Sequence, residues 1–193
     1  MGVTQVHTVA SGPVPPDHAD DPVTATAMAA RGGDQAASSA FVRLTQVEVW
    51  RFVAALVGVP HADDVTQETY LRAFRALPDF AGRSSVRTWL LAIARRACAD
   101  HIRTAVRVRR LEARVAAEPA SGTVRDHAGL HAAAELVAKL PAERRVAFVL
   151  TQVLGLSYQQ AAEIEDVPVG TIRSRVARAR ADLVAALDAA QAG

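Results

Sequence analysis

Residues 156–175 read LSYQQAAEIEDVPVGTIRSR, and this stretch predicts two short helices joined by a tight turn. Ser157 is a good N-cap for the first helix, and the small Ala161 and Ala162 allow the two helices to approach closely. Pro168 fits the first turn of the second helix, where a missing N–H costs nothing. The buried seam is expected to consist of Ile164, Val167, Ile172 and Val176. The stretch therefore predicts a helix-turn-helix unit.

The second helix of this unit has a polar, basic face, expected to be exposed. That face carries Thr171, Arg173, Ser174, Arg175 and Arg178, and no acidic residue occurs from Thr171 to Arg180. Such a helix fits a DNA major groove, with its first turn at base edges and its arginines at phosphates. A small helical bundle with a solvated basic face is the alternative. A helix-turn-helix alone leaves open whether the protein is a repressor, an activator or something else.

Helical spacing continues through most of the chain, and no β-type alternation competes with it, which predicts an all-α fold. One amphipathic helix, ended by Gly58 and Pro60, is expected from Phe41, Leu44, Val47, Phe52, Val53 and Leu56. A second helix is expected to be capped by Asp63 or Asp64 and stopped by Pro78. A long helix then begins at about Ser85, and its apolar face carries Trp89, Leu90, Ile93 and Ile102.

Composition divides the chain into two small helical domains. Residues 1–21, rich in Pro, Gly, Asp and Ala, are expected to be a disordered leader. The first domain is expected over 22–107 and the second over 131–190. Residues 108–130, which contain the run EPASGT, have the composition of a flexible linker.

Charge is concentrated in two arginine blocks, although the net charge of the 193-residue chain is only +2. Residues 83–114 carry nine arginines against two acidic residues, and residues 171–180 carry four arginines and no acidic residue. Two separate basic blocks are the pattern expected for two contacts with a polyanion.

Several other classes of protein are excluded. No apolar run approaches 18 residues and no signal peptide is apparent, so we expect a soluble cytoplasmic protein without membrane contact. Cys98 is the only cysteine, and with His101 it does not complete a zinc site. No nucleophile elbow or glycine-rich phosphate loop occurs, so we expect no catalytic residues, no metal and no cofactor.

Three segments, in order, resemble the extracytoplasmic-function (ECF, group IV) sigma factors of bacterial RNA polymerase. They are DDVTQETYLRAF (63–74), FAGRSSVRTWLLAIARRACADHIR (80–103) and PVGTIRSRVARAR (168–180). Within this family, the sequence most resembles the sigma C branch of actinobacteria. The resemblance implies a sigma domain 2 bundle and a sigma domain 4 helix-turn-helix. It also implies a factor that carries core RNA polymerase to promoters for transcription initiation.

The resemblance also implies roles for individual residues. Contact with the clamp helices of the beta-prime subunit falls to Asp63, Asp64, Gln67, Glu68 and Arg72. Recognition of the opened, single-stranded minus-10 element falls to Phe80, Arg83, Ser84, Ser85, Arg87, Arg95, Arg96 and Arg103. Contact with the double-stranded minus-35 element falls to Val169, Thr171, Arg173, Ser174, Arg175 and Arg178. Many relatives are held by an anti-sigma factor, which adds a further candidate partner.

The sequence departs from the family pattern at two places. Arg96 stands where many relatives have Asn, and Arg lacks the acceptor with which Asn reads a base. Glu165-Asp166 replaces the usual Leu-Gly of the turn, and Asp tolerates the left-handed conformation better than most residues. The rival functions are an autonomous helix-turn-helix repressor or activator and a sequestering interaction module. Whether the two domains dock on one another stays open at this level.

Overall fold

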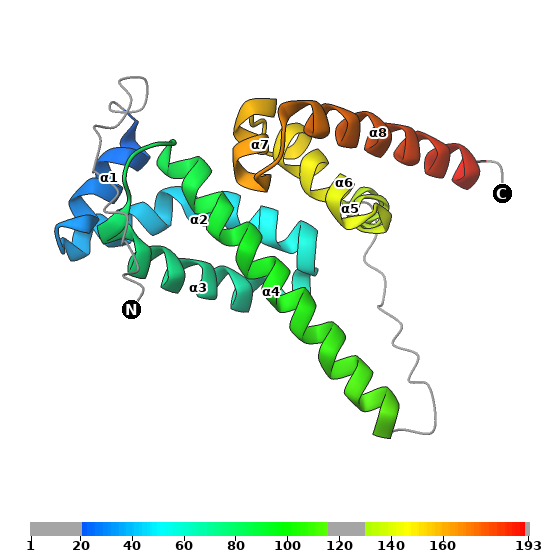
Figure 1. Ribbon diagram of the computed structural model, residues 1–193, viewed down its shortest axis with the longest axis horizontal. Coiled ribbons are helices and arrows are strands. Elements are labelled where there is room, and N and C mark those ends of the chain that lie inside the picture. The colour runs from blue at the N-terminus through cyan, green and yellow to red at the C-terminus, as the bar shows by residue number, and fades with distance from the viewer. Residues whose placement is uncertain (1–20, 116–129, 192–193) are drawn as a thin grey trace, which may run out of the picture.

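The computed structural model describes residues 21–115 and 130–191. The first body consists of α1 (Pro22–Arg31), α2 (Gln35–Val57), α3 (Val59–Ala76), the 3-10 turn η2 (Leu77–Asp79) and α4 (Val86–Val115). The second consists of α5 (Leu130–Lys139), α6 (Ala142–Phe148), the π-helical turn η3 (Val149–Val153), α7 (Tyr158–Glu165) and α8 (Val169–Gln191). Figure 1 shows both bodies, and the described ranges contain no strand, which confirms the all-α prediction. The expected leader lies almost entirely outside these ranges, as does most of the expected linker.

An aspartate cap and the sequence Gly58-Val59-Pro60 set the ends of the first helices. Asp34 caps α2, since its carboxylate accepts hydrogen bonds from the backbone N–H groups of Ala36 and Ala37 at 2.8 and 3.1 Å. Gly58, at φ +86°, ends α2, and α3 begins at the next residue with Pro60 in its first turn. The prediction of a cap at Asp63 or Asp64 is therefore wrong. Both carboxylates lie one turn inside α3 and are exposed.

The core of the first body is aromatic and aliphatic. Phe41 and Phe52 of α2 are fully buried, and the Phe41 ring meets Tyr70 and Phe74 edge-on at centroid distances of 6.4 and 6.2 Å. Leu44 and Val47 were expected on the buried stripe, but they are 53% and 57% exposed. The buried face of α2 instead passes through Thr45 and Val49, and the Thr45 hydroxyl is hydrogen-bonded to Tyr70 Oη at 2.7 Å.

Helix α4 packs into the bundle with its first half only. Leu90, Leu91, Ala94 and Cys98 are buried, whereas Ile102, which was predicted for the apolar face, is exposed. The helix continues to Val115, eight residues past the predicted end of the domain, into the range expected as linker. None of the helices in the described ranges is long and apolar enough to span a bilayer.

The helix-turn-helix forms as its sequence predicts. The Ser157 side chain accepts a hydrogen bond from the N–H of Gln160, whose side chain in return accepts one from the N–H of Ser157. Asp166 takes the left-handed conformation (φ +54°, ψ +51°) that the turn requires. Ala161, Ala162, Ile164, Ile172 and Val176 are all buried in the seam, and Val167 packs at its edge. Helix α8 begins at Val169, one residue later than expected.

Burial of Cys98 generates a test of the packing between α4 and its neighbours. Loss of solvation raises the pKa of the Cys98 thiol from 9.0 to about 12. Since the thiolate is the reactive form, we expect iodoacetamide at pH 8 to modify the folded chain at least about 100-fold more slowly than the chain in denaturant. Mass spectrometry of quenched samples measures the two rates. Equal rates would contradict the described packing.

Candidate functional site

The acidic ridge on α3, formed by Asp63, Asp64, Gln67, Glu68 and Arg72, is held in place from both ends. At one end, the Trp50 indole N–H donates a hydrogen bond to Asp63 at 2.7 Å. At the other, Arg72 reaches Glu68 at 2.7 Å and Asp100 of α4 at 2.6 Å. The Arg72 guanidinium lowers the pKa of the Asp100 carboxyl. Asp63, Asp64 and Gln67 remain exposed, so they present a preorganised polar surface.

A groove of about 510 Å³ lies beside this ridge, between α2 and α3. Val42, Val47, Trp50 and Tyr70 supply apolar surface, and Asp63, Thr66 and Gln67 contribute polar groups from α3. This groove was not predicted from the sequence. The available signal was Val47, which is apolar but stands out of phase with the buried residues of α2.

The loop before α4 carries two residues that were predicted to contact the minus-10 element but are buried. Phe80 is 5% exposed and packs against Trp89 at a centroid distance of 5.0 Å. The Ser85 hydroxyl is buried at the start of α4, where it accepts a hydrogen bond from the N–H of Thr88 at 3.0 Å. Their burial argues against a direct role in base capture in this conformation. Both side chains contact other protein groups in this conformation, while Arg83 is exposed and Ser84 half-buried.

The arginines predicted for the minus-10 element have different partners. Arg87 forms hydrogen bonds with Glu48 of α2 at 2.8 and 2.9 Å, and this contact raises the pKa of Arg87. The same guanidinium donates to the carbonyl oxygen of Leu154, in the second body, at 2.8 Å. Arg96 is exposed, and Arg103 pairs with Asp100.

Arg95 and Arg175 meet at one buried carboxylate, that of Glu165. The Glu165 side chain is only 2% exposed and lies at the C-terminal end of α7. Arg95 of α4 donates from Nε to one of its oxygens, and Arg175 of α8 donates to the other at 3.3 Å. One residue therefore joins an arginine of each basic block and links the two bodies, which α4 and α7 bring side by side. Figure 1 shows α7 beside the α2–α4 bundle.

The exposed face of α8 differs from the prediction at Arg175. This side chain is only 16% exposed, because it is paired with Glu165 and, at 2.7 Å, with Glu143 of α6. Arg173, Ser174 and Arg178 are exposed as expected. Val169 and Thr171, at the start of the helix, are half-buried. The free basic face is therefore narrower than the sequence pattern indicates.

Arg145 makes another contact between the two bodies. Its guanidinium donates to the carbonyl oxygen of Leu56, at the end of α2, at 3.4 Å and to that of Leu140 at 3.0 Å. Partial burial lowers the pKa of Arg145. The sequence analysis did not identify this residue, because a single arginine outside the basic blocks carries no pattern.

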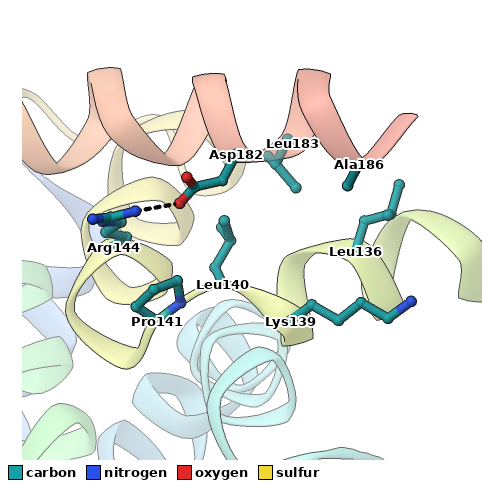
Figure 2. Close-up of a pocket in the computed structure, with 8 residues that line it drawn as sticks. All are labelled: Leu136, Lys139, Leu140, Pro141, Arg144, Asp182, Leu183 and Ala186. Carbon is teal, nitrogen blue, oxygen red and sulfur yellow. Dashed lines mark hydrogen bonds and ion pairs between the residues drawn. The ribbon is translucent and has the colours of Figure 1, made fainter. Parts of the chain in front are cut away.

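A smaller cavity of about 220 Å³ lies in the second body, between the α5–α6 junction and the second half of α8. Figure 2 shows Leu136, Leu140, Pro141 and Leu183 around it, with the Arg144–Asp182 ion pair (2.6 Å) at one end. Lys139 and the Arg144–Asp182 pair are the polar groups of an otherwise apolar lining. Over residues 21–115 and 130–191, no three His, Cys, Asp or Glu side chains are grouped so that they could hold a metal ion.

Family models match both bodies of the chain. The model for sigma-70 region 2 matches residues 41–108, and the model for sigma-70 region 4 matches residues 130–183.

Curated relatives cover most of the chain. It is 51% identical over 170 residues to the probable RNA polymerase sigma-C factor of Mycobacterium bovis, an alignment that covers 86% of this chain and 91% of that protein. It is 34% identical over 162 residues to the ECF RNA polymerase sigma-E factor of Escherichia coli, covering 77% of this chain and 85% of the relative.

Two solved structures resemble most of the fold. CnrH in complex with the cytosolic domain of CnrY has a TM-score of 0.68 at 28% identity, covering 88% of this chain and 99% of CnrH. RpoE in complex with the anti-sigma factor NepR from Bartonella quintana has a TM-score of 0.65 at 27% identity, covering 76% and 94% of the two chains. With both sigma-70 regions present in order and half of the residues shared with a sigma-C factor, the chain belongs to the ECF group of RNA polymerase sigma factors.

Proposed function

We propose that this sigma factor binds core RNA polymerase through α3 and directs it to promoters through α4 and α8. The observation that carries the proposal is the separation of charge between surfaces. The ridge at Asp63–Arg72 is mostly acidic, whereas α4 and α8 present arginines. Negative charges repel DNA, so the acidic ridge suits a basic protein partner. The arginines suit nucleic acid because they carry the opposite charge.

The two DNA-binding surfaces divide the promoter between them. The opened minus-10 element contacts Arg83, Ser84, Arg87, Arg95, Arg96 and Arg103. The duplex minus-35 element contacts Val169, Thr171, Ser174 and two exposed arginines of α8, Arg173 and Arg178. Residues 22–107 and 131–190 are the corresponding functional units. The role is one of binding and strand opening rather than catalysis, and it places the protein in the cytoplasm with the polymerase.

The described conformation is a closed form of the factor. Arg87 and Arg95 of the minus-10 surface, together with Arg175 of α8, already bind protein oxygens. Separation of the two bodies would free Arg95 from Glu165 and Arg87 from the Leu154 carbonyl. Arg87 would keep Glu48, and Arg175 would keep Glu143 and Glu165, because these pairs lie within one body. Since the similar structures of CnrH and RpoE are complexes with CnrY and the anti-sigma factor NepR, we include an anti-sigma protein among the expected partners.

Replacing Arg173 and Arg178 with alanine tests the minus-35 surface. Each lost phosphate contact flattens the plot of log affinity against log salt by about 0.9, so we expect a change of about two for the double variant. Fluorescence anisotropy of the holoenzyme on labelled promoter DNA measures the slope. Arg43→Ala with Arg51→Ala, on exposed residues of α2, is the charge-matched control. An unchanged slope in the α8 variant would place the DNA elsewhere.

Replacing Asp64 and Glu68 with alanine tests the polymerase surface. Loss of the complementary charge should slow association with core polymerase on the order of tenfold at low salt. Binding of duplex DNA by the free protein should stay unchanged. Asp79→Ala with Asp188→Ala removes the same charge at exposed positions outside the ridge and should leave core association as in the wild type. Equal loss of polymerase and DNA binding would refute the division of surfaces.

The substitution Glu165→Gln tests the closed form. The amide keeps the volume but removes the charge that Arg95 and Arg175 share, so we expect docking to weaken by about 1–3 kcal/mol. Pulsed-EPR distances between labels on α1 and α8, in a Cys98→Ala background, should become longer and broader. Glu163→Gln, on the exposed face of the same helix, should leave them unchanged. Identical distributions in both variants would show that Glu165 does not hold the bodies together.

A further inference from the structure

The second half of α4 projects from the bundle, and the rest of the described chain does not bury it. The buried residues of this helix lie in its first half, and no residue from Ile102 to Glu112 is buried. Figure 1 shows this end of α4 extending away from both bodies. A helix that leaves its bundle for several turns exposes a surface with which a partner can pair.

One face of this projecting helix is basic. Arg103, Arg107 and Arg110 stand at positions i, i+4 and i+7, so they lie on the same side of the helix, and all three are exposed. Within the part of the chain that the structure describes, Arg107 and Arg110 form no ion pair, whereas Arg103 is paired with Asp100. We call Arg103, Arg107 and Arg110 the α4 stripe.

We propose that the α4 stripe binds the phosphate backbone of the duplex DNA between the minus-10 and minus-35 elements. The inference rests on the proposed promoter-binding function and adds a third DNA surface to it. Continuity supports it, since Arg103 ends the minus-10 segment and the stripe prolongs the same helix face. Chain order supports it as well, because this half of α4 lies between the two DNA-binding segments in the sequence.

The dimensions of the stripe suit a DNA backbone. Seven residues of α-helix rise about 10 Å, so that is the span from Arg103 to Arg110. One strand of B-DNA carries a phosphate for every 3.4 Å or so of helix axis, so the stripe reaches two or three successive phosphates. Arginine is the side chain best suited to bidentate phosphate contacts.

The composition of the projecting end argues against other occupants. No aromatic residue occurs between Ala99 and Val115 other than His101, so the segment lacks the stacking platforms typical of single-strand binding. It also lacks the Trp and Phe with which interfacial helices enter a lipid surface. Phosphate contacts position a protein without reading sequence. The stripe therefore anchors the spacer duplex whatever its sequence.

The test compares Arg107→Gln/Arg110→Gln with the control Arg109→Gln/Arg43→Gln in holoenzyme on promoter DNA. Arg109 is also exposed but lies about 200° around the helix from Arg107, so the control removes equal charge from other faces. For the stripe variant we expect the slope of log affinity against log salt to flatten by about two, and no such change in the control. Neutral methylphosphonate linkages in the spacer next to the minus-10 element should weaken wild-type binding but leave the stripe variant unaffected.

Two results would overturn the inference. One is a stripe variant whose slope of log affinity against log salt equals that of the wild type and whose binding is weakened by the neutral linkages as much as wild-type binding. The other is weaker binding of the stripe variant to core polymerase in the absence of DNA, which would make the stripe a polymerase surface. The wild-type holoenzyme must first be shown to initiate transcription at the promoter. A negative result for the α4 stripe then counts against the stripe alone and not against the proposed function.

Discussion

The two bodies meet at the Glu165 carboxylate, which is buried between Arg95 and Arg175. A carboxylate removed from water is stable only when charged donors replace its hydration, and here the donors come from both basic blocks. If the bodies part, Glu165 loses Arg95 but keeps Arg175, and the surrounding water replaces the lost partner. The buried carboxylate therefore keeps a charged partner when the two bodies separate.

Pairing with protein oxygens also decides which arginines are free to bind another molecule. Those of the first half of α4 that face the second body are bound to Glu48, Leu154 or Glu165. Arg173 and Arg178, and the α4 stripe beyond Arg103, stay free of such partners in the described chain. Separation of the two bodies thus frees Arg95 from Glu165 and Arg87 from the Leu154 carbonyl, whereas Arg173 and Arg178 are already exposed.

Much of this was predictable from short-range patterns. The Ser157 cap, the left-handed Asp166 and the seam of the helix-turn-helix follow from local chemistry, and the structure confirms them. The residues whose burial differs from expectation depend on packing at long range. Phe80 and Ser85 are buried by their fit against α4, Leu44 and Val47 lie beside the core stripe of α2, and Arg175 is covered by Glu143 and Glu165. No local pattern distinguishes an arginine that faces DNA from one that pairs with a distant carboxylate, and Glu165 was recognised as unusual only for its place in a turn.

The most direct test of the central claim is transcription in vitro from genomic DNA with core polymerase, with and without the purified protein, followed by sequencing of RNA 5′ ends. The account predicts a set of start sites that depends on the protein and lies downstream of a shared pair of promoter elements. A set of 5′ ends that is the same with and without the protein would contradict it.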